Sequence, residues 1–224
     1  MIKYSALFIL FFLSIANAKF YEVTSIDEIM SFATPNSIFL FDLDRTIIAD
    51  SSSFTSLTAE PVESQTAQRI AELQAKGIHV LALSRRKSNE VERTISQLKS
   101  LGIDFTKSSP KTDVTDFGPA VTYKDGILFA SRQSKGPILA TFLEKINLKP
   151  SNIILLDDQW FNIESVGESM AIAKLSYDGF YYRAEDVHAN TFSAFRPIQE
   201  VLEKDMVIEP HTNVILTCAA LFNE

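Results

Sequence analysis

Two aspartates, Asp42 and Asp44, follow directly after a short apolar run, Ser37–Phe41. In an extended chain their side chains point to the same side, because alternate residues of a strand share a face. Two carboxylates this close repel each other unless they share a cation or a proton. The spacing therefore indicates either a bound divalent ion or separate acid and base roles, with a solvated Asp-x-Asp turn as the structural alternative.

A second polar group consists of Ser84, Arg85 and Arg86, which follow the apolar run Ile78–Leu83. A hydroxyl beside two permanent cations is an environment suited to a phosphate group, although serine and arginine also open many helices and loops. Lys135 precedes a predicted helix, so its ammonium group and the first helical amides can address one anion together. An ordinary surface position is the alternative for Lys135.

A third polar group begins with the acidic pair Asp157 and Asp158, which ends another apolar run and is followed by Asn162. Oxygen ligands of this kind suit Mg²⁺. Between them stand two aromatic residues, Trp160 and Phe161, which we interpret as packing groups because aromatic side chains usually bury large areas. The sequence thus predicts that a magnesium site includes the end of this third run.

The elements that position these groups alternate along the chain. Runs of β-type residues predict strands, and apolar residues at helical spacing predict helices, two of which end at a glycine. The predicted strands are Ser37–Phe41, Ile78–Leu83 and Asn152–Leu156, and the predicted helices are Pro61–Lys76, Glu90–Leu101 and Pro137–Ile146. This alternation implies an α/β fold with a doubly wound, mostly parallel sheet and right-handed crossovers.

One further pair of β-prone runs flanks Asp125-Gly126, so Val121–Phe129 is predicted to form a small β-hairpin insertion. In open α/β sheets, ligands bind beyond the carboxyl ends of the strands, near the topological switch point. Each polar group described above follows a predicted strand or precedes a predicted helix. We therefore expect these groups to meet at one edge of the sheet.

Together the motifs resemble those of the haloacid-dehalogenase-like superfamily, most of whose members are phosphatases that use an aspartate nucleophile. The resemblance covers roughly residues 37–166. In its exported character and small insertions, the chain is similar to a branch of secreted bacterial proteins of otherwise unknown function. The matching residues are Asp42, Asp44 and Thr46 in the first motif, Ser84 in the second, Lys135 in the third, and Asp158 with Asn162 in the last. Asp157 stands where many members have glycine, and an Asp-Asp variant also occurs in that family.

The resemblance implies a mechanism in which Asp42 attacks phosphorus and forms an aspartyl-phosphate, with Asp44 as general acid and then general base. It implies Mg²⁺ as the cofactor, held by the Asp42 and Asp158 carboxylates and the Asp44 backbone carbonyl. It assigns supporting positions at the metal to Asp157 and Asn162. Binding of the transferred phosphate is assigned to Thr46, Ser84 and Lys135, and we add Arg85 because it follows Ser84 directly.

Members of this superfamily usually carry a cap domain between the first motif and the serine, or between the serine and the lysine. Both intervals are short here, and only the hairpin and the loop Phe105–Gly118 lie outside predicted core elements. We therefore expect little or no cap domain and an open site. Such a site suits a phosphorylated small molecule or a phosphorylated macromolecule as substrate.

Two other functions remain open beside that of a phosphoric monoester hydrolase. The chain is alternatively a catalytically inactive binding protein on the same fold, since a fold alone does not establish activity, or a phosphotransferase. The complete set of motif residues favours an enzyme. Asp44 favours phosphate chemistry, because dehalogenases of this superfamily lack the second aspartate.

The composition, with 46% hydrophobic and 22% charged residues among 224, is that of an ordinary globular protein, and residues 19–224 are predicted to form a single domain. The formal net charge of −7 disfavours nonspecific nucleic-acid binding. Cys218 is the only cysteine, so no disulfide can form within the chain, and we interpret it as a buried thiol.

The first 18 residues have the features of a secretory signal peptide. Lys3 precedes an apolar run, Ala6–Ile15, and the small residues Ala16 and Ala18 follow it. The apolar run is shorter than the roughly 20 residues of a spanning helix, which makes an uncleaved membrane anchor the less favoured alternative. We expect cleavage after Ala18 and an exported bacterial protein, periplasmic or secreted, with no membrane association after cleavage.

Overall fold

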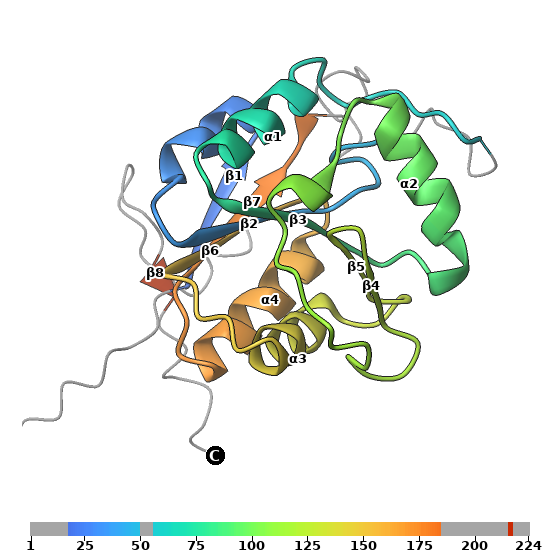
Figure 1. The fold of residues 1–224 in the computed structure, drawn as a ribbon. Helices are drawn as coiled ribbons and strands as arrows, with labels where there is room; N and C mark the ends of the chain where they lie inside the picture. The colour runs from blue at the N-terminus through green and yellow to red at the C-terminus, as the bar shows by residue number, and fades with distance from the viewer. Residues whose placement is uncertain (1–17, 50–55, 185–214, 217–224) are drawn as a thin grey trace, which may run out of the picture.

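The computed structural model describes residues 18–49, 56–184 and 215–216, which form one sheet with helices on both faces (Figure 1). The strands are β1 (Ala18–Val23), β2 (Ser37–Phe41), β3 (His79–Ser84), β4 (Thr122–Lys124), β5 (Ile127–Phe129), β6 (Asn152–Asp157), β7 (Tyr177–Tyr182) and β8 (Ile215–Leu216). The α-helices are α1 (Thr66–Ala75), α2 (Val91–Ser100), α3 (Lys135–Lys145) and α4 (Trp160–Ile172). Three 3-10 helices are η1 (Ile26–Phe32), η2 (Ser88–Glu90) and η3 (Phe105–Lys107).

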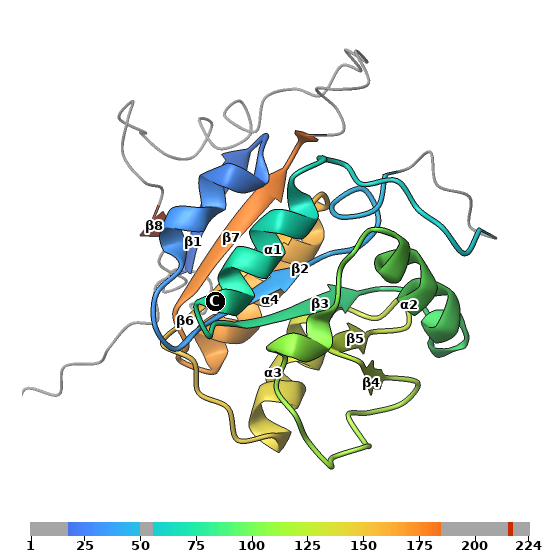
Figure 2. The ribbon, with the colours of Figure 1, turned by 45° about the horizontal axis from the view of Figure 1, so that its top comes forward.

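The strand order across the sheet is β4-β5-β3-β2-β6-β7-β1-β8, which can be followed across the molecule in Figure 2. The strands from β5 to β1 are all parallel to their neighbours, and β4 and β8 are antiparallel at the two edges. The predicted mostly parallel α/β sheet is confirmed. After β2 the chain first adds β3 on one side of β2 and later adds β6 on its other side. The topological switch point of the sheet therefore lies at the carboxyl end of β2.

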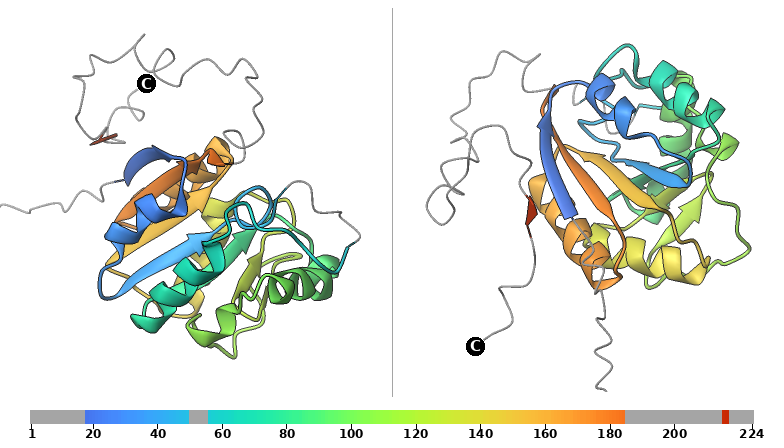
Figure 3. Two further views of the ribbon diagram at one scale, coloured as in Figure 1. Left: turned by 90° about the horizontal axis from the view of Figure 1, so that it is seen from above. Right: turned by 90° about the vertical axis from the view of Figure 1, so that its left-hand side faces the viewer.

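Alternating side chains of the central strand β2 enter two separate hydrophobic cores. Phe39 and Phe41 face the core that includes η1, α1 and α2, whereas Ile38 and Leu40 face the core that includes α3 and α4. Figure 3 shows these two helix layers on opposite faces of the sheet. All five residues of β2 are buried, as expected of a parallel strand covered on both faces.

Helix α2 begins one residue after the expected start at Glu90, and the starts of α1 and α3 differ from those expected by two residues or more. Helix α1 begins at Thr66 rather than at Pro61, because Pro61 forms an isolated bridge with Ile48 and the Val62 amide donates to the Ile47 carbonyl. Helix α3 begins at Lys135, two residues before Pro137. Proline is tolerated in the first turn of a helix, so it did not mark the start.

The predicted hairpin is present as β4 and β5, and β5 also pairs in parallel with β3. The hairpin therefore extends the main sheet. Among the described strands, β1, β7 and β8 were not predicted from the sequence. They extend the sheet at its other side, where β1 pairs in parallel with β7 and antiparallel with β8.

The predicted signal peptide lies almost wholly outside the described residues, and Cys218 lies outside them too. Ala18, the residue before the expected cleavage point, begins β1 and pairs with Tyr177. Among the described residues, no helix has the length and apolar character needed to cross a membrane.

Helices α3 and α4 pack unusually close together at Gly136. A Cβ atom at this position would lie 2.0 Å from the backbone oxygen of Ser165, and the Gly136 amide donates to the Ser165 hydroxyl at 3.2 Å. The neighbouring residue in α3 is Lys135. The close approach of the two helices therefore fixes where the first turn of α3, and the lysine in it, lies against the sheet.

We predict that Gly136→Ala destabilises the protein by at least about 1–3 kcal/mol, because a backbone carbonyl cannot move away as a side chain can. The matched control is Gly167→Ala in α4, where the added Cβ would meet the ring end of Phe20 at 2.8 Å. A ring can shift where a backbone carbonyl cannot, so the control loses less stability. Urea unfolding of both variants measures the difference, and equal losses would contradict the role given to the Ser165 backbone.

Candidate active site

A tight turn at the end of β2 positions the first two aspartates. The Asp42 amide donates to the Leu156 carbonyl at 2.9 Å, which continues the pairing with β6 beyond the strand. The Leu43 carbonyl then accepts from the amides of Ile47 and Ile48 at 2.9 and 2.8 Å, and the chain reverses with φ of 62° at Arg45. Asp42 is thereby held at the sheet edge, and Asp44 projects from the turn.

Lys135 is fully buried and joins two strand ends through its ammonium group. The group donates to Asp42 Oδ1 and, at 2.6 Å, to Asp157 Oδ2. Burial alone would lower the pKa of Lys135, but the charges of Asp157 and Asp42 outweigh it, so the pKa is raised and the lysine is charged. Lys135 is thus the first residue of α3, at the helix terminus expected from the sequence, and its ammonium group lies among the carboxylates at the ends of β2 and β6, while its contact with a phosphate stays a prediction.

The two aspartates that end β6 have different surroundings. Asp157 is fully buried and accepts from the Gln159 amide at 2.8 Å and from Asn162 Nδ2 at 3.0 Å. Asp158 instead lines the cleft and pairs with Arg45 Nε at 3.1 Å. Burial, followed by the charge of Asp157, raises the pKa of Asp158 to about 6. Of the two, Asp158 is the one that a ligand in the cleft can reach.

Oxygens of Asp42, Asp157 and Asp158 lie within 4.8 Å of one another. Three carboxylates face one lysine, with Arg45 on the outer side of Asp158, so this cluster retains an excess of negative charge. In keeping with this, burial raises the pKa of Asp42 well above its usual range, while Lys135 opposes the shift. A cation or a shared proton would relieve the excess.

One uncharged oxygen completes the set of donors near these carboxylates. Asn162 is buried and lines the cleft, and its Oδ1 has no hydrogen-bond partner among the described residues. A buried carbonyl oxygen without a partner costs free energy, so it fits a ligand position. The residues present therefore fit a hard cation bound by oxygens.

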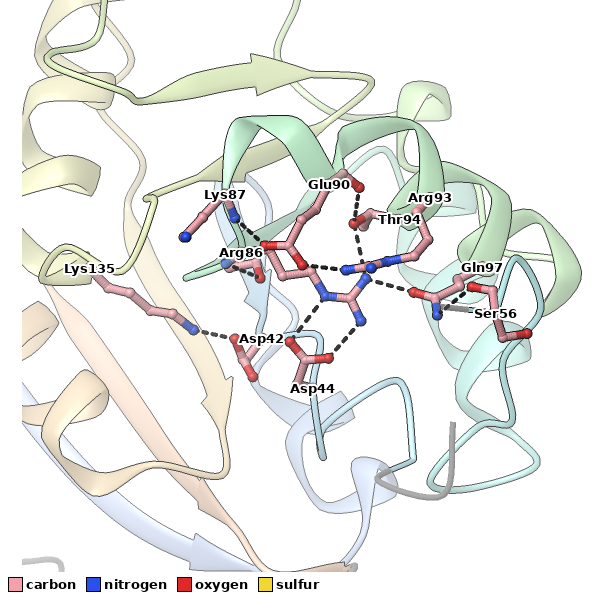
Figure 4. Close-up of polar contacts among 11 residues, drawn as sticks. Asp42, Asp44, Ser56, Arg86, Lys87, Glu90, Arg93, Thr94, Gln97 and Lys135 are labelled. Atoms are coloured by element: carbon pink, nitrogen blue, oxygen red, sulfur yellow. Dashed lines mark hydrogen bonds and ion pairs between the residues drawn. The ribbon is translucent and has the colours of Figure 1, made fainter. Parts of the chain in front are cut away.

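Asp44 is held by Arg86 in a bidentate ion pair (Figure 4). Arg86 donates to its two carboxylate oxygens at 3.1 and 2.6 Å, and the remaining guanidinium nitrogen donates to Thr94 at 3.0 Å and to Gln97 at 2.7 Å. Thr94 and Gln97 belong to α2. Arg86 is almost fully buried, so α2 fixes the guanidinium, and the guanidinium fixes Asp44.

The two hydroxyl residues predicted to bind phosphate are buried beside this network. Ser84 is fully buried, and its Oγ accepts from the Arg86 amide at 3.2 Å. Thr46 is also buried, and its Oγ1 has no partner among the described residues. Neither residue is among those that line the cleft. Their contact with a phosphate stays a prediction.

A cleft of about 550 Å³ opens at this edge of the sheet. Its lining includes Asp42, Asp44, Arg45, Arg85, Arg86, Glu90, Arg132, Asp158, Gln159 and Asn162. Four of these residues were not predicted from the sequence to belong to a site: Arg45, Glu90, Arg132 and Gln159. Arg45 and Gln159 stand beside motif residues, which was an available signal, but Arg132 reaches the cleft only because β5 pairs with β3.

Three Chlamydia proteins, each with the printed name "Putative outer membrane protein", are similar to this chain. The Chlamydia pneumoniae protein is 28% identical over 131 residues, 58% of this chain and 50% of that protein. The protein of Chlamydia trachomatis serovar D is 29% identical over 119 residues, 53% of this chain and 45% of that protein. The chain spans about half the length of these curated relatives.

Two solved structures of the class C acid phosphatase from Bacillus anthracis show a distant similarity. Both are 14% identical to this chain and match over 82% of it and 84% of the phosphatase chain. The TM-score is 0.41 for one structure and 0.37 for the other, which has tungstate bound.

The family comparison covers the larger part of the sequence. The matched range begins just after the aspartates of the first motif and includes Ser84, Lys135 and the acidic end of β6. Residues 49–205 match the family described as "Protein of unknown function (DUF2608)", and the chain belongs to this family.

Proposed function

We propose that this protein is a magnesium-dependent phosphatase that hydrolyses phosphomonoesters through an aspartyl-phosphate at Asp42. The observation that carries the proposal is the position of Asp42 at the end of the central strand, hydrogen-bonded to the buried Lys135 and open to a cleft. Asp157 and Asp158 lie beside it. This is the arrangement that the motif resemblance to haloacid-dehalogenase-like phosphatases implies.

In the first step, an oxygen of the Asp42 carboxylate attacks phosphorus, and the bond from phosphorus to the ester oxygen breaks. Lys135 holds Oδ1, so Oδ2 is the oxygen available for attack. In the second step, water attacks the same phosphorus, the acyl-phosphate bond breaks, and inorganic phosphate leaves with Asp42 restored as a carboxylate. Lys135 limits the repulsion between the nucleophile and the incoming phosphate throughout.

Asp44 is the proposed proton carrier for both steps. It would give a proton to the departing ester oxygen and later take one from the attacking water. Both Asp44 oxygens accept hydrogen bonds from Arg86, an arrangement suited to the base role. As an acid, Asp44 would carry the proton on one carboxyl oxygen and donate it to the ester oxygen in the cleft.

Mg²⁺ would be held by Asp42 and Asp158, with Asn162 as a further oxygen donor and Asp157 in support through Lys135. When bound, the ion would neutralise part of the negative charge of the carboxylates and of the phosphate. The Asp44 backbone carbonyl is a further proposed ligand. For the transferred phosphate oxygens we propose Ser84, Thr46 and Lys135, whereas Arg85, which was also expected there from the sequence, lines the cleft and lies beside Arg132.

Export of the protein is a separate proposal, supported by the signal-like residues 1–18 and by the names of the Chlamydia relatives. Cleavage after Ala18 would leave Lys19 as the first residue. We expect cell fractionation to recover the expressed full chain outside the cytoplasm, with an N-terminal sequence that begins Lys-Phe-Tyr. Uncleaved chain retained in the cytoplasm would contradict this proposal.

We predict that Asp42→Asn and Asp44→Asn fail in different ways. Asp42→Asn lowers turnover by about 10⁴-fold or more, because an amide cannot replace the attacking carboxylate. Asp44→Asn keeps the nucleophile but removes the proton carrier. With an aryl phosphate it should release at most one burst of product per enzyme and accumulate covalent phosphate. With an alkyl phosphate even the burst should vanish.

The measurement is rapid-mix product release combined with intact-mass detection of the phosphorylated protein. Wild-type protein on both ester types is the control. Steady turnover by Asp42→Asn would overturn the assigned nucleophile. Near-wild-type turnover of both ester types by Asp44→Asn would overturn its acid and base roles. A mixed panel of phosphomonoesters, with and without Mg²⁺, tests the proposed activity itself.

A further prediction separates the two aspartates at the end of β6. Asp158→Ala should weaken Mg²⁺ binding in calorimetry with a small change in stability, because Asp158 faces the cleft. Asp157→Ala leaves the buried Lys135 with one carboxylate partner instead of two, so it should also lower the free energy of unfolding by about 3 kcal/mol or more. Mg²⁺ affinity unchanged in Asp158→Ala would remove that residue from the ligand set.

A further inference from the structure

Two arginines at the cleft, Arg85 and Arg132, are held side by side by the loops that follow β3 and β5. The Ala130 amide donates to the Ser84 carbonyl at 2.7 Å, so the pairing of the two strands continues past their ends. The Arg132 amide then donates to the Arg85 carbonyl at 2.8 Å, and Arg85 Nη2 donates back to the Arg132 carbonyl at 2.9 Å. Two cationic residues are thus fixed together.

These two arginines differ from the other two that line the cleft. Arg45 is paired with Asp158, and Arg86 is paired with Asp44. Within residues 18–49, 56–184 and 215–216, neither Arg85 nor Arg132 forms an ion pair with a carboxylate. Holding two like charges together is unfavourable unless an anion lies between them. The pair is therefore prepared for a negatively charged ligand.

The contacts of Arg85 leave part of its guanidinium available. The guanidinium carbon Cζ of Arg85 lies 5.1 Å from the centre of the Phe161 ring. The Arg85 Nε is buried without a hydrogen-bond partner among the described residues. A guanidinium that contacts an aromatic ring can still donate from its edge to a phosphate or carboxylate. The sequence analysis expected Phe161 to pack, but it is 48% exposed and lies beneath this cation.

The depth of the residues separates this pair from the reacting group. Asp42 is only 6% exposed, and Lys135 is fully buried, so the nucleophile lies at the floor of the cleft. Arg132 is exposed, and the exposed Phe161 beside Arg85 lies at the surface as well. An anion bound by the two arginines would therefore belong to a part of the substrate remote from the transferred phosphate.

We propose that Arg85 and Arg132 form a subsite for a second anionic group, a phosphate or a carboxylate, on the phosphomonoester substrate. This inference rests on the proposed function and names the substrate class. The chain carries a net charge of −7 and a carboxylate cluster at the cleft floor, which repel a substrate with two anionic groups. The positive charges of Arg85 and Arg132 offset that repulsion and orient the substrate.

The test compares three probes that share a three-carbon chain: propyl phosphate, propane-1,3-diyl bisphosphate and 3-phosphooxypropanoate. The measured quantity is the ratio of kcat/KM for each doubly anionic probe to that for propyl phosphate. Arg85→Gln and Arg132→Gln should each lower this ratio roughly tenfold, as expected for loss of one charge-assisted hydrogen bond. The two doubly anionic probes show whether phosphate or carboxylate is preferred.

The matched control is Lys76→Gln, which removes one exposed positive charge after α1, at the opposite end of β3 from the cleft. It should leave the ratio unchanged. In Arg132→Gln, glutamine keeps the Cβ atom, so the backbone strain of the positive φ of 65° at this position is the same as in the wild-type protein. If Arg85→Gln and Arg132→Gln lowered kcat/KM equally for all three probes, the ratio would not change. That outcome would assign the arginines to the transferred phosphate and overturn the proposal.

A binding measurement keeps this inference separate from the proposed activity. Calorimetry on the wild-type protein should show tighter binding of propane-1,3-bisphosphonate than of propylphosphonate, and Arg132→Gln should remove the difference. If no probe is turned over, the proposed phosphatase activity fails, and this binding comparison decides the subsite alone. Equal affinity of the two phosphonates in the wild-type protein would overturn the subsite.

Discussion

The contact of the buried Lys135 ammonium with Asp42 and Asp157 is the interaction on which the rest of the site depends. A charge this deep is tolerated only when it is paired, and breaking such a pair costs about 3–5 kcal/mol. The pair joins the ends of β2 and β6 to the first turn of α3. Because α3 packs on α4 through Gly136, the helix layer that contains α3 and α4 holds the Asp42 carboxylate in place.

The opposite helix layer controls the second aspartate. Asp44 is only two residues from Asp42, yet it pairs with Arg86, which is fixed by Thr94 and Gln97 on α2. The two neighbouring carboxylates are therefore held by different cations, Asp42 by Lys135 of α3 and Asp44 by Arg86, which α2 fixes (Figure 4). This separation gives each carboxylate its own environment, which is the condition for two carboxylates to take different roles in one reaction.

Elements with strong local signals were predictable, and those that depend on distant partners were not. The strand Ser37–Phe41 was predicted with its observed bounds, because an uninterrupted apolar run between a turn and an aspartate has few other structures. Strand β7 was missed because its sequence includes Asp178 and Gly179. Tyr21 and Asn152 satisfy that buried carboxylate, and the glycine lets Ile163 of α4 approach closely. Neither reason is visible locally.

The α/β alternation and the polar residues that meet at one edge of the sheet could be read from the amino-acid sequence alone, because strand ends and motif spacing are local properties. Which cation pairs with which carboxylate depends on the packing of distant elements and had no local signal. Arg85 and Arg86 are neighbours in the chain, yet Arg86 pairs with Asp44, whereas Arg85 lies beside Arg132. Ion pairing depends on distance in space and on burial, and both are set by how β3, β5 and α2 pack together.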